Sequence, residues 1–149
     1  MTTKKKTVFI DGPISTHFIA QTIAKHQTKT TIGAHQVFLG QVRADTIKGK
    51  TVKAIDYSAY IEMAQQELEA IKEKTFQKHN LTCLHIYHSI NLVPVGQLCL
   101  FVLVSSSHRK QATQALKFLI EEIKKKTPVF GKEIFDDHSH QWKTNNPTK

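Results

Sequence analysis

The chain has 149 residues, of which 40% are hydrophobic and 22% charged, and its formal net charge is +9 at pH 7. These values are typical of one globular domain with a hydrophobic core, and the sequence holds no apolar run near the roughly 18 residues that a membrane span needs. The apolar part of the basic N-terminus is too short for a signal peptide, so we expect a cytoplasmic protein.

The excess of positive charge indicates a negatively charged partner or substrate. Nucleic acid, a small anion and an acidic protein all fit this charge. The lysines gather at termini, turns and expected helix ends without forming one stripe, and the aromatic residues alternate into expected core positions instead of forming a stacking platform. We therefore favour a small anion or an acidic protein over nucleic acid.

The first half of the chain alternates between strand and helix patterns. Period-two alternation predicts strands over residues 7–10, 33–42 and 51–60, with Gly40 marking a bulge or a close approach and a polar loop over residues 43–50. Ser15 is expected to cap a helix that ends near His26. From residue 61 to about residue 79 the period becomes helical.

The second half predicts a hairpin, a long helix and two short strands. Strands are expected over 81–90 and 97–106, and the second is apolar on both faces, which places it centrally in a sheet. Ser107 is expected to cap the next helix, and Pro128 to end it. Short strands follow at 133–136 and 141–143. We expect one α+β domain over residues 1–143, with a mostly antiparallel sheet and packed helices, and a disordered tail over 144–149.

Cysteine and histidine spacing gives little indication of a metal site. Cys83 and Cys99 lie in apolar segments and are expected to be buried free thiols on neighbouring strands. The segment D-D-H-S-H at 136–140 offers two histidines on one strand face, but no third ligand is evident. His85 and His88 are expected on opposite faces of a strand, in structural roles.

Cations stand at both ends of the long helix. His108 and Arg109 lie at its start, where positive charge opposes the helix dipole and, beside free backbone amides, favours an anion site. The lysines at 124–126 occupy its last turn, where cations suit the dipole. Lys132 follows shortly after, and a lysine with a lowered pKa serves as a base or nucleophile. Arg43, at a strand end, is either solvated or a donor to a phosphate or carboxylate.

An ordered set of motifs resembles the large, catalytic subunit of molybdopterin synthase over most of residues 33–142. The motifs are G-A-x-x-x-F-x-G-x-V-R at 33–43, Tyr57, Y-x-x-M-A at 60–64, H-x-I at 88–90 before a Pro-x-Gly turn, S-x-H-R at 106–109, and I-K-x-x-x-P at 123–128 followed by K-E-I-F. Each motif alone is weak, whereas the set in this order is specific.

The resemblance implies a fold, a reaction and partners. It implies an α/β-hammerhead type of α+β fold and a homodimer, on which a small ubiquitin-like sulfur carrier docks to give a heterotetramer. The carrier's C-terminal thiocarboxylate then supplies sulfur to cyclic pyranopterin monophosphate, which becomes molybdopterin. The step uses no metal or organic cofactor. The alternative is a noncatalytic basic dimer that only binds a ubiquitin-like partner.

The resemblance also assigns residues. Lys124 matches an essential lysine near the thiocarboxylate. The family's second lysine position is occupied here by Gly131, so either Lys132 takes over that role or the protein works with one lysine. The candidate catalytic residues are Lys124 and, on the first alternative, Lys132. The residues expected to bind substrate are Phe38, Gln41, Val42, Arg43, His108, Arg109, Gly131 and Glu133.

Helix length constrains how these residues combine. His108 and Lys124 are sixteen positions apart, which is about 24 Å along a helix that rises 1.5 Å per residue. Both ends cannot touch one small substrate in one subunit. We therefore expect a site that combines Lys124 of one protomer with His108 and Arg109 of its partner.

Overall fold

The computed structural model describes residues 8–143, and the tail predicted over 144–149 lies outside them. These residues form three helices and eight strands. In chain order they are β1 (Phe9–Asp11), α1 (Thr16–His26), β2 (Ala34–Gln41), β3 (Thr46–Ile47), β4 (Lys50–Ala59), α2 (Ile61–Lys78), β5 (Cys83–Pro94), β6 (Leu98–Ser106), α3 (Arg109–Lys126), β7 (Val129–Phe135) and β8 (His140–Trp142).

One open sheet runs through the molecule in the order β2-β6-β5-β4-β7-β8. Neighbouring strands along this path are antiparallel, while β1 adds to β5 in parallel and β3 adds to β4 in antiparallel orientation. The expected α+β class with a mostly antiparallel sheet is confirmed.

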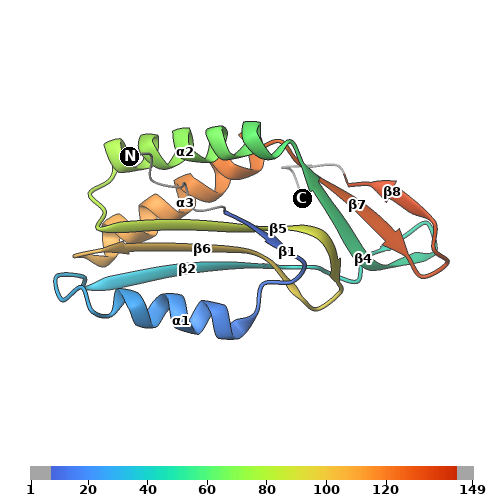
Figure 1. The fold of residues 1–149 in the computed structure, drawn as a ribbon, viewed down its shortest axis with the longest axis horizontal. Coiled ribbons are helices and arrows are strands. Elements are labelled where there is room, and N and C mark those ends of the chain that lie inside the picture. Colours follow the sequence, from blue (N-terminus) through green and yellow to red (C-terminus); the bar gives the residue numbers. More distant parts are fainter. Residues whose placement is uncertain (1–7, 144–149) are drawn as a thin grey trace, which may run out of the picture.

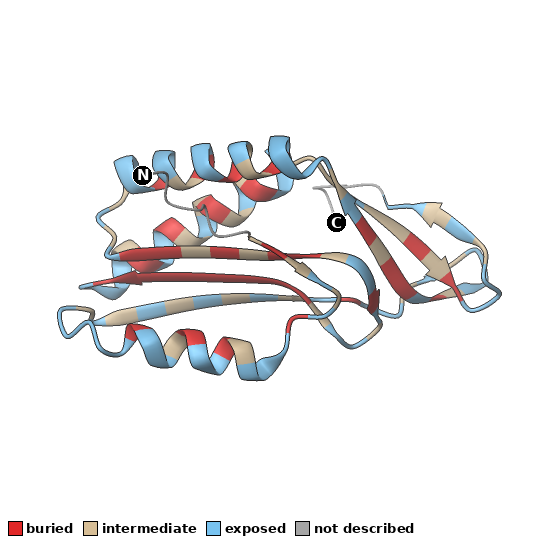
Figure 2. Ribbon diagram, viewed as in Figure 1, coloured by how far each residue is buried: buried red, intermediate tan, exposed pale blue. Residues whose placement is uncertain are grey.

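Helices cover both faces of the sheet around β6 (Figure 1). Helices α2 and α3 lie on one face, where Leu68, Ile71 and Leu119 join the larger hydrophobic core. Helix α1 lies on the opposite face, where Ile19 packs with Phe101 in a second, smaller cluster. Strand β6 is buried from Cys99 to Ser106, as expected of a strand covered on both faces (Figure 2).

Strands β3, β4, β7 and β8 form an arm that extends beyond the helices (Figure 1). Strand β5 connects the arm to the helix-covered sheet, because its first half pairs with β6 and its last four residues pair with β4. Asn91 stands at this change of partner with a φ of 69°, a left-handed conformation that asparagine tolerates. The bend brings β4 and β7 close to the C-terminal end of α3.

Helix α3 ends just before Pro128, as the sequence predicted. The helix stops at Lys126, and Thr127 is extended with φ −81° and ψ 124°, as expected for a residue before proline. Strand β7 begins at Val129, only two residues later. The lysines of the last helical turn therefore lie directly beside the first residues of β7.

Several predicted boundaries are wrong, most of them where strand pairing decides the structure. The loop predicted at 43–50 contains β3, which forms a hairpin with β4 through Lys48 and Gly49, both at positive φ. Strand β5 continues to Pro94, and β7 begins four residues before the predicted start, since both pair with β4 there. The N-cap of α3 is His108 instead of Ser107.

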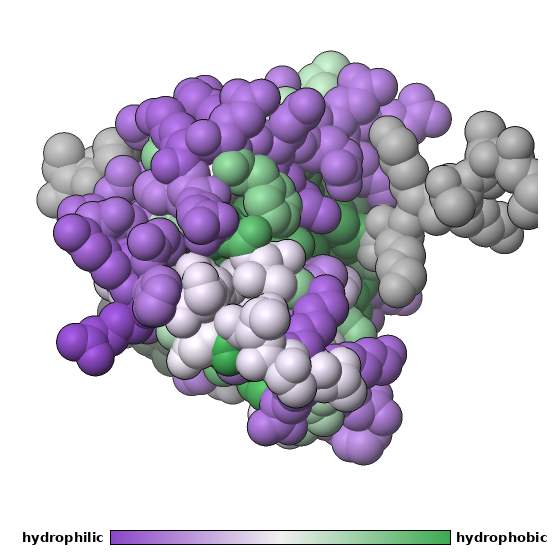
Figure 3. All heavy atoms as spheres, turned by 90° about the vertical axis from the view of Figure 1, so that its left-hand side faces the viewer, coloured by the Kyte–Doolittle hydropathy of each residue, from purple (hydrophilic) through white to green (hydrophobic). Residues whose placement is uncertain are grey.

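The surface is largely hydrophilic at the end of the molecule that lies left in Figure 1, with smaller apolar areas in its middle (Figure 3). In the described part of the chain, each helix is too short or too polar to cross a lipid bilayer. The two cysteines are buried and unpaired on the neighbouring strands β5 and β6, as predicted.

Candidate functional site

A cavity of about 210 Å³ lies where the C-terminal end of α3 meets the arm. Strands β4 and β5 contribute aromatic side chains to its wall, and β7 contributes its first three residues. The described residues that line it are Tyr57, His88, Ile123, Lys124, Lys125, Thr127, Val129, Phe130, Gly131 and Lys143.

Three lysines give this cavity its charge. Lys124 and Lys125 come from the last turn of α3, and Lys143 follows β8. No carboxylate is among the described lining residues. Cations gathered around a recess raise the local concentration of anions, so the cavity suits a negatively charged ligand.

The protein around Lys124 lowers the pKa of its amine. The residue as a whole is exposed, but burial around the amine lowers the pKa of Lys124, and the positive charge of Lys143 lowers it further. Cys99 on β6 acts in the opposite direction. A lysine with a lowered pKa has a larger neutral fraction near pH 7 and accepts a proton more readily than an ordinary lysine.

His88 and Tyr57 form a neutral aromatic wall. Burial lowers the pKa of His88 to about 4, with a smaller contribution from Lys124, so the imidazole is neutral at pH 7. Its Nδ1 lies 2.7 Å from the Ser89 carbonyl oxygen and therefore donates to it. Burial also raises the pKa of Tyr57, whose ring meets the imidazole edge-on at 5.1 Å between centroids. The charge of the cavity therefore comes from its lysines.

Gly131 forms part of the cavity floor opposite Tyr57. A Cβ at this position would lie 3.1 Å from Ile55 Cγ2 and 3.4 Å from Tyr57 Cε1, so a side chain would press on the wall. Lys132 points to the other face of the strand, where its amine lies 5.9 Å from the centre of the Trp142 ring.

Comparison with known proteins places the chain in a family. Residues 12–126 match the family model described as MoaE protein. The chain belongs to this family. It is 34% identical over 113 residues to the molybdopterin synthase catalytic subunit of Bos taurus, a match that covers 76% of this chain and 59% of that relative. The chain thus spans about three fifths of the length of this relative.

Two solved structures share the fold. Molybdopterin synthase from Staphylococcus aureus superposes with a TM-score of 0.80 at 31% identity, covering 96% of this chain and 100% of that one. A complex of subunits 1 and 2 of molybdopterin-converting factor from Helicobacter pylori gives a TM-score of 0.79 at 19% identity, covering 93% and 90%. The second likeness extends to the fold only.

This member of the MoaE family brings two of the ten predicted site residues, Lys124 and Gly131, into the cavity. His108 and Arg109 lie exposed at the opposite end of α3. Arg43 is exposed after β2 and forms an ion pair with Asp45 at 3.4 Å.

The other predicted site residues lie in the sheet. Phe38 packs against the larger core and Val42 is buried within it, so both support the end of β2 from inside. Gln41 is exposed beside them. Glu133 is buried two positions beyond Gly131 on β7 and accepts a hydrogen bond from Gln141 Nε2 at 3.4 Å.

Sequence reasoning missed two features of the cavity. His88 was expected to be structural, although its motif stood among the marks of the resemblance. Lys143 carried no motif, and its role depends on how β8 pairs with β7. The sequence signal that could have identified Lys143 is the turn at 136–139. An antiparallel hairpin over this turn places Lys143 opposite Gly131.

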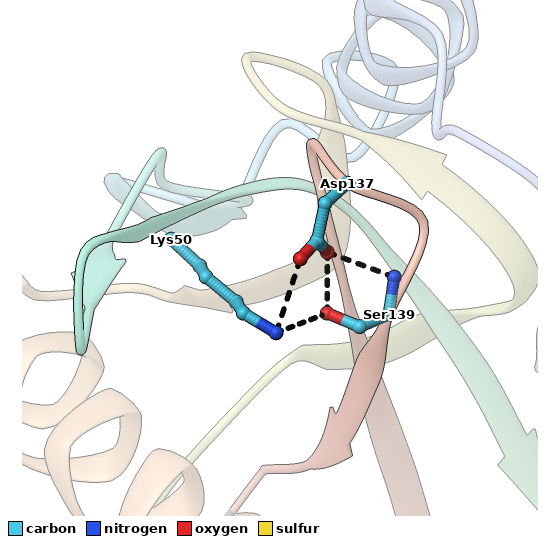
Figure 4. A network of polar contacts seen from close by, with 3 residues as sticks. All are labelled: Lys50, Asp137 and Ser139. Carbon is cyan, nitrogen blue, oxygen red and sulfur yellow. Dashed lines mark hydrogen bonds and ion pairs between the residues drawn. The ribbon is translucent and has the colours of Figure 1, made fainter.

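The turn between β7 and β8 is held by a polar network (Figure 4). Asp137 accepts hydrogen bonds from the backbone and hydroxyl of Ser139 and forms an ion pair with Lys50 at 3.0 Å. The bonds from Ser139, more than Lys50, hold the pKa of Asp137 below its usual range. His138 Nδ1 lies 2.7 Å from the amine of Lys53. The D-D-H-S-H segment therefore fixes the hairpin that positions β8.

A separate group could in principle hold a metal ion. His26, Cys83 and His85 bring their ligand atoms within 4.8 Å of one another beneath α1. The two Nε2 atoms lie only 2.7 Å apart, the distance of a direct hydrogen bond, and the Lys29 amine is 3.0 Å from the Cys83 sulfur. A positive amine at that sulfur opposes a cation. Hydrogen bonds explain why these side chains lie close together. Sequence spacing did not reveal the group, because His26 comes from α1, far from β5 in the sequence.

Proposed function

We propose that this chain is the catalytic subunit of a molybdopterin synthase. In this proposal it transfers sulfur from the thiocarboxylated C-terminus of a small carrier protein to cyclic pyranopterin monophosphate, which yields molybdopterin. The observation that carries the proposal is the amine of Lys124, which has a lowered pKa and lies in a cavity with two further lysines.

The chemistry of the reactants fits this cavity. The thiocarboxylate and the phosphate are both anions, so cations are needed to bring them together and to stabilise charge that develops during transfer. The protonated amine of Lys124 would hold the thiocarboxylate. Its neutral form would take a proton from the water that cleaves the acyl–sulfur bond after transfer, which leaves the sulfur on the pterin and frees the carrier as a carboxylate.

Three exposed cations outside the cavity would bind the pterin substrate. Arg43, His108 and Arg109 are exposed, as phosphate ligands must be, and backbone amides at the start of α3 add donors. We propose a homodimer that carries one carrier protein on each subunit, in the cytoplasm. In that assembly, the partner subunit's His108 and Arg109 would complete the cavity around Lys124.

Conversion of the pterin by purified protein and thiocarboxylated carrier tests the proposal. Lys124→Ala should lower the rate of molybdopterin formation by about 100-fold or more, the size of a lost acid–base group. Lys117→Ala, an exposed change in the middle of α3, is the matched control and should leave the rate unchanged. A Lys124→Ala variant with the wild-type rate would contradict the role of this cavity.

A noncatalytic module that binds the carrier is the second candidate, favoured by glycine at position 131. It predicts that wild-type protein binds the carrier with full affinity but forms no molybdopterin. Calorimetric titration with the carrier, run beside the conversion assay, separates the two functions.

A further inference from the structure

Strand pairing places Lys143 directly across from Gly131. In the ladder between β7 and β8, Lys132 faces Trp142, so Lys143, directly after β8, lies opposite Gly131. The backbone N–H of Lys143 donates to the Gly131 carbonyl oxygen at 2.8 Å. The position of Lys143 is therefore fixed by its backbone, whatever side chain it carries.

The two lysines of this hairpin face opposite sides. Residues directly across two paired strands share a face, and successive residues alternate. Lys132 and Trp142 occupy one face, where the amine lies over the indole ring. Gly131 and Lys143 occupy the other, and both line the cavity. Since glycine has no side chain, Lys143 is the residue of this cross-strand pair that brings an amine to the cavity.

Positive charge predominates in the cavity. The acidic residue of β7, Glu133, is buried and accepts a hydrogen bond from Gln141; it raises the pKa of Tyr57 but does not line the cavity. His88 on β5 and Tyr57 on β4 line the cavity as neutral groups, Cys99 on β6 raises the pKa of Lys124, and Lys125 adds positive charge from the same helix as Lys124. No carboxylate is among the described residues that line the recess. Two amines in one recess repel each other until an anion lies between them.

We propose that Lys143 is a second functional lysine of this cavity, which binds the anionic end of a reactant together with Lys124. The inference rests on the proposed function for its substrate, the carrier thiocarboxylate. The sequence left two alternatives, namely Lys132 as the second lysine or a single functional lysine. Lys143 is a third possibility. The second amine comes from the strand opposite position 131, in place of a side chain at 131 itself.

Three variants test this inference in the conversion assay. Lys143→Met removes the charge and keeps the length, and should lower kcat/KM for the carrier by about 10- to 100-fold, the effect of one lost charge-assisted hydrogen bond. Lys143→Arg keeps the charge and should retain most of the activity. Lys132→Met, on the other face of the hairpin, tests the alternative in which Lys132 supplies the second amine. Equal activity of Lys143→Met and wild type, or loss in Lys132→Met instead, would overturn the proposal.

A second readout does not depend on turnover. Removing the Lys143 charge should raise the pKa of Lys124, because that charge now depresses it. An NMR titration of isotope-labelled lysine side chains should show this rise in Lys143→Met and no rise in Lys143→Arg or Lys132→Met. An unchanged Lys124 titration in Lys143→Met would sink the inference. Wild-type protein that forms no molybdopterin would instead refute the proposed function, with the titration still reporting on Lys143.

Discussion

Burial decides the protonation state of His88, with consequences for folding as well as for the site. Its pKa is about 4 in the folded protein, against an ordinary value of 6.5. Between these two values the unfolded chain binds a proton that the folded chain does not, so stability rises with pH across this window. The folded state therefore loses stability as the pH falls from 6.5 to 4, by about 3 kcal/mol from this group alone.

His88→Gln should remove this dependence. We expect the free energy of unfolding in urea to fall less steeply between pH 6.5 and pH 4 in the variant than in wild type, since glutamine does not titrate there. His17→Gln, which replaces an exposed histidine of α1, should keep the wild-type slope. Identical slopes for His88→Gln and wild type would show that burial of His88 is not linked to folding.

Single positions near Gly131 show why the site could be predicted only in part. Lys124 was singled out by the I-K-x-x-x-P motif of the resemblance, since the helix pattern alone treats the three lysines of the last turn alike. Lys132 is only one residue from the cavity-lining Gly131, yet strand alternation turns it to the opposite face. Lys143 enters through cross-strand pairing, a contact that a linear pattern does not encode.

At the scale of elements, α1 and α3 begin differently. Ser15 Oγ accepts a hydrogen bond from the Phe18 amide at 3.1 Å and caps α1 as predicted. Helix α3 has no side-chain cap of this kind, because its N-cap is His108. Ser107 lies instead directly after the end of β6. It is so close to Gly33 that a Cβ on residue 33 would come within 2.2 Å of the Ser107 carbonyl oxygen. Ser107 thus precedes the helix by two positions, and the N-cap position falls on His108.

Two serine substitutions test this difference. Ser15→Ala should destabilise the protein by about 1 kcal/mol, the usual cost of a lost N-cap. Ser107→Ala should change the free energy of unfolding by less than about 0.5 kcal/mol, as for an ordinary surface substitution. Urea unfolding of both variants at neutral pH provides the comparison. An equal loss in both would mean that Ser107 caps α3 after all.

Elements with a strong local pattern were predicted, and elements that depend on pairing were not. Strand β6 is apolar on both faces and α3 carries a regular apolar stripe, so each was evident in the sequence. Strand β3 has two residues, and the first residues of β7 have no clear alternation. Both exist because β4 offers a pairing edge, which becomes visible only when distant segments are brought together.

At the scale of the whole molecule, α3 separates two groups of cations. Lys124 lies in the cavity at its C-terminal end, and His108 and Arg109 lie at its N-terminal end. The helix is about 24 Å long between them, as the sequence indicated. One subunit therefore cannot bring both groups to one small substrate, and a two-fold dimer is the simplest assembly that can.

Complementation between two inactive variants tests this arrangement. Lys124→Ala and Arg109→Ala should each be inactive as homodimers. Random mixing makes half of the dimers mixed, and in each of these one site combines an intact Lys124 with the partner's intact Arg109. The mixture should therefore regain about a quarter of wild-type activity. If both residues served a site within one subunit, every site in a mixed dimer would carry one substitution. Molybdopterin formation would then stay at the level of the separate variants, and the shared site would be wrong.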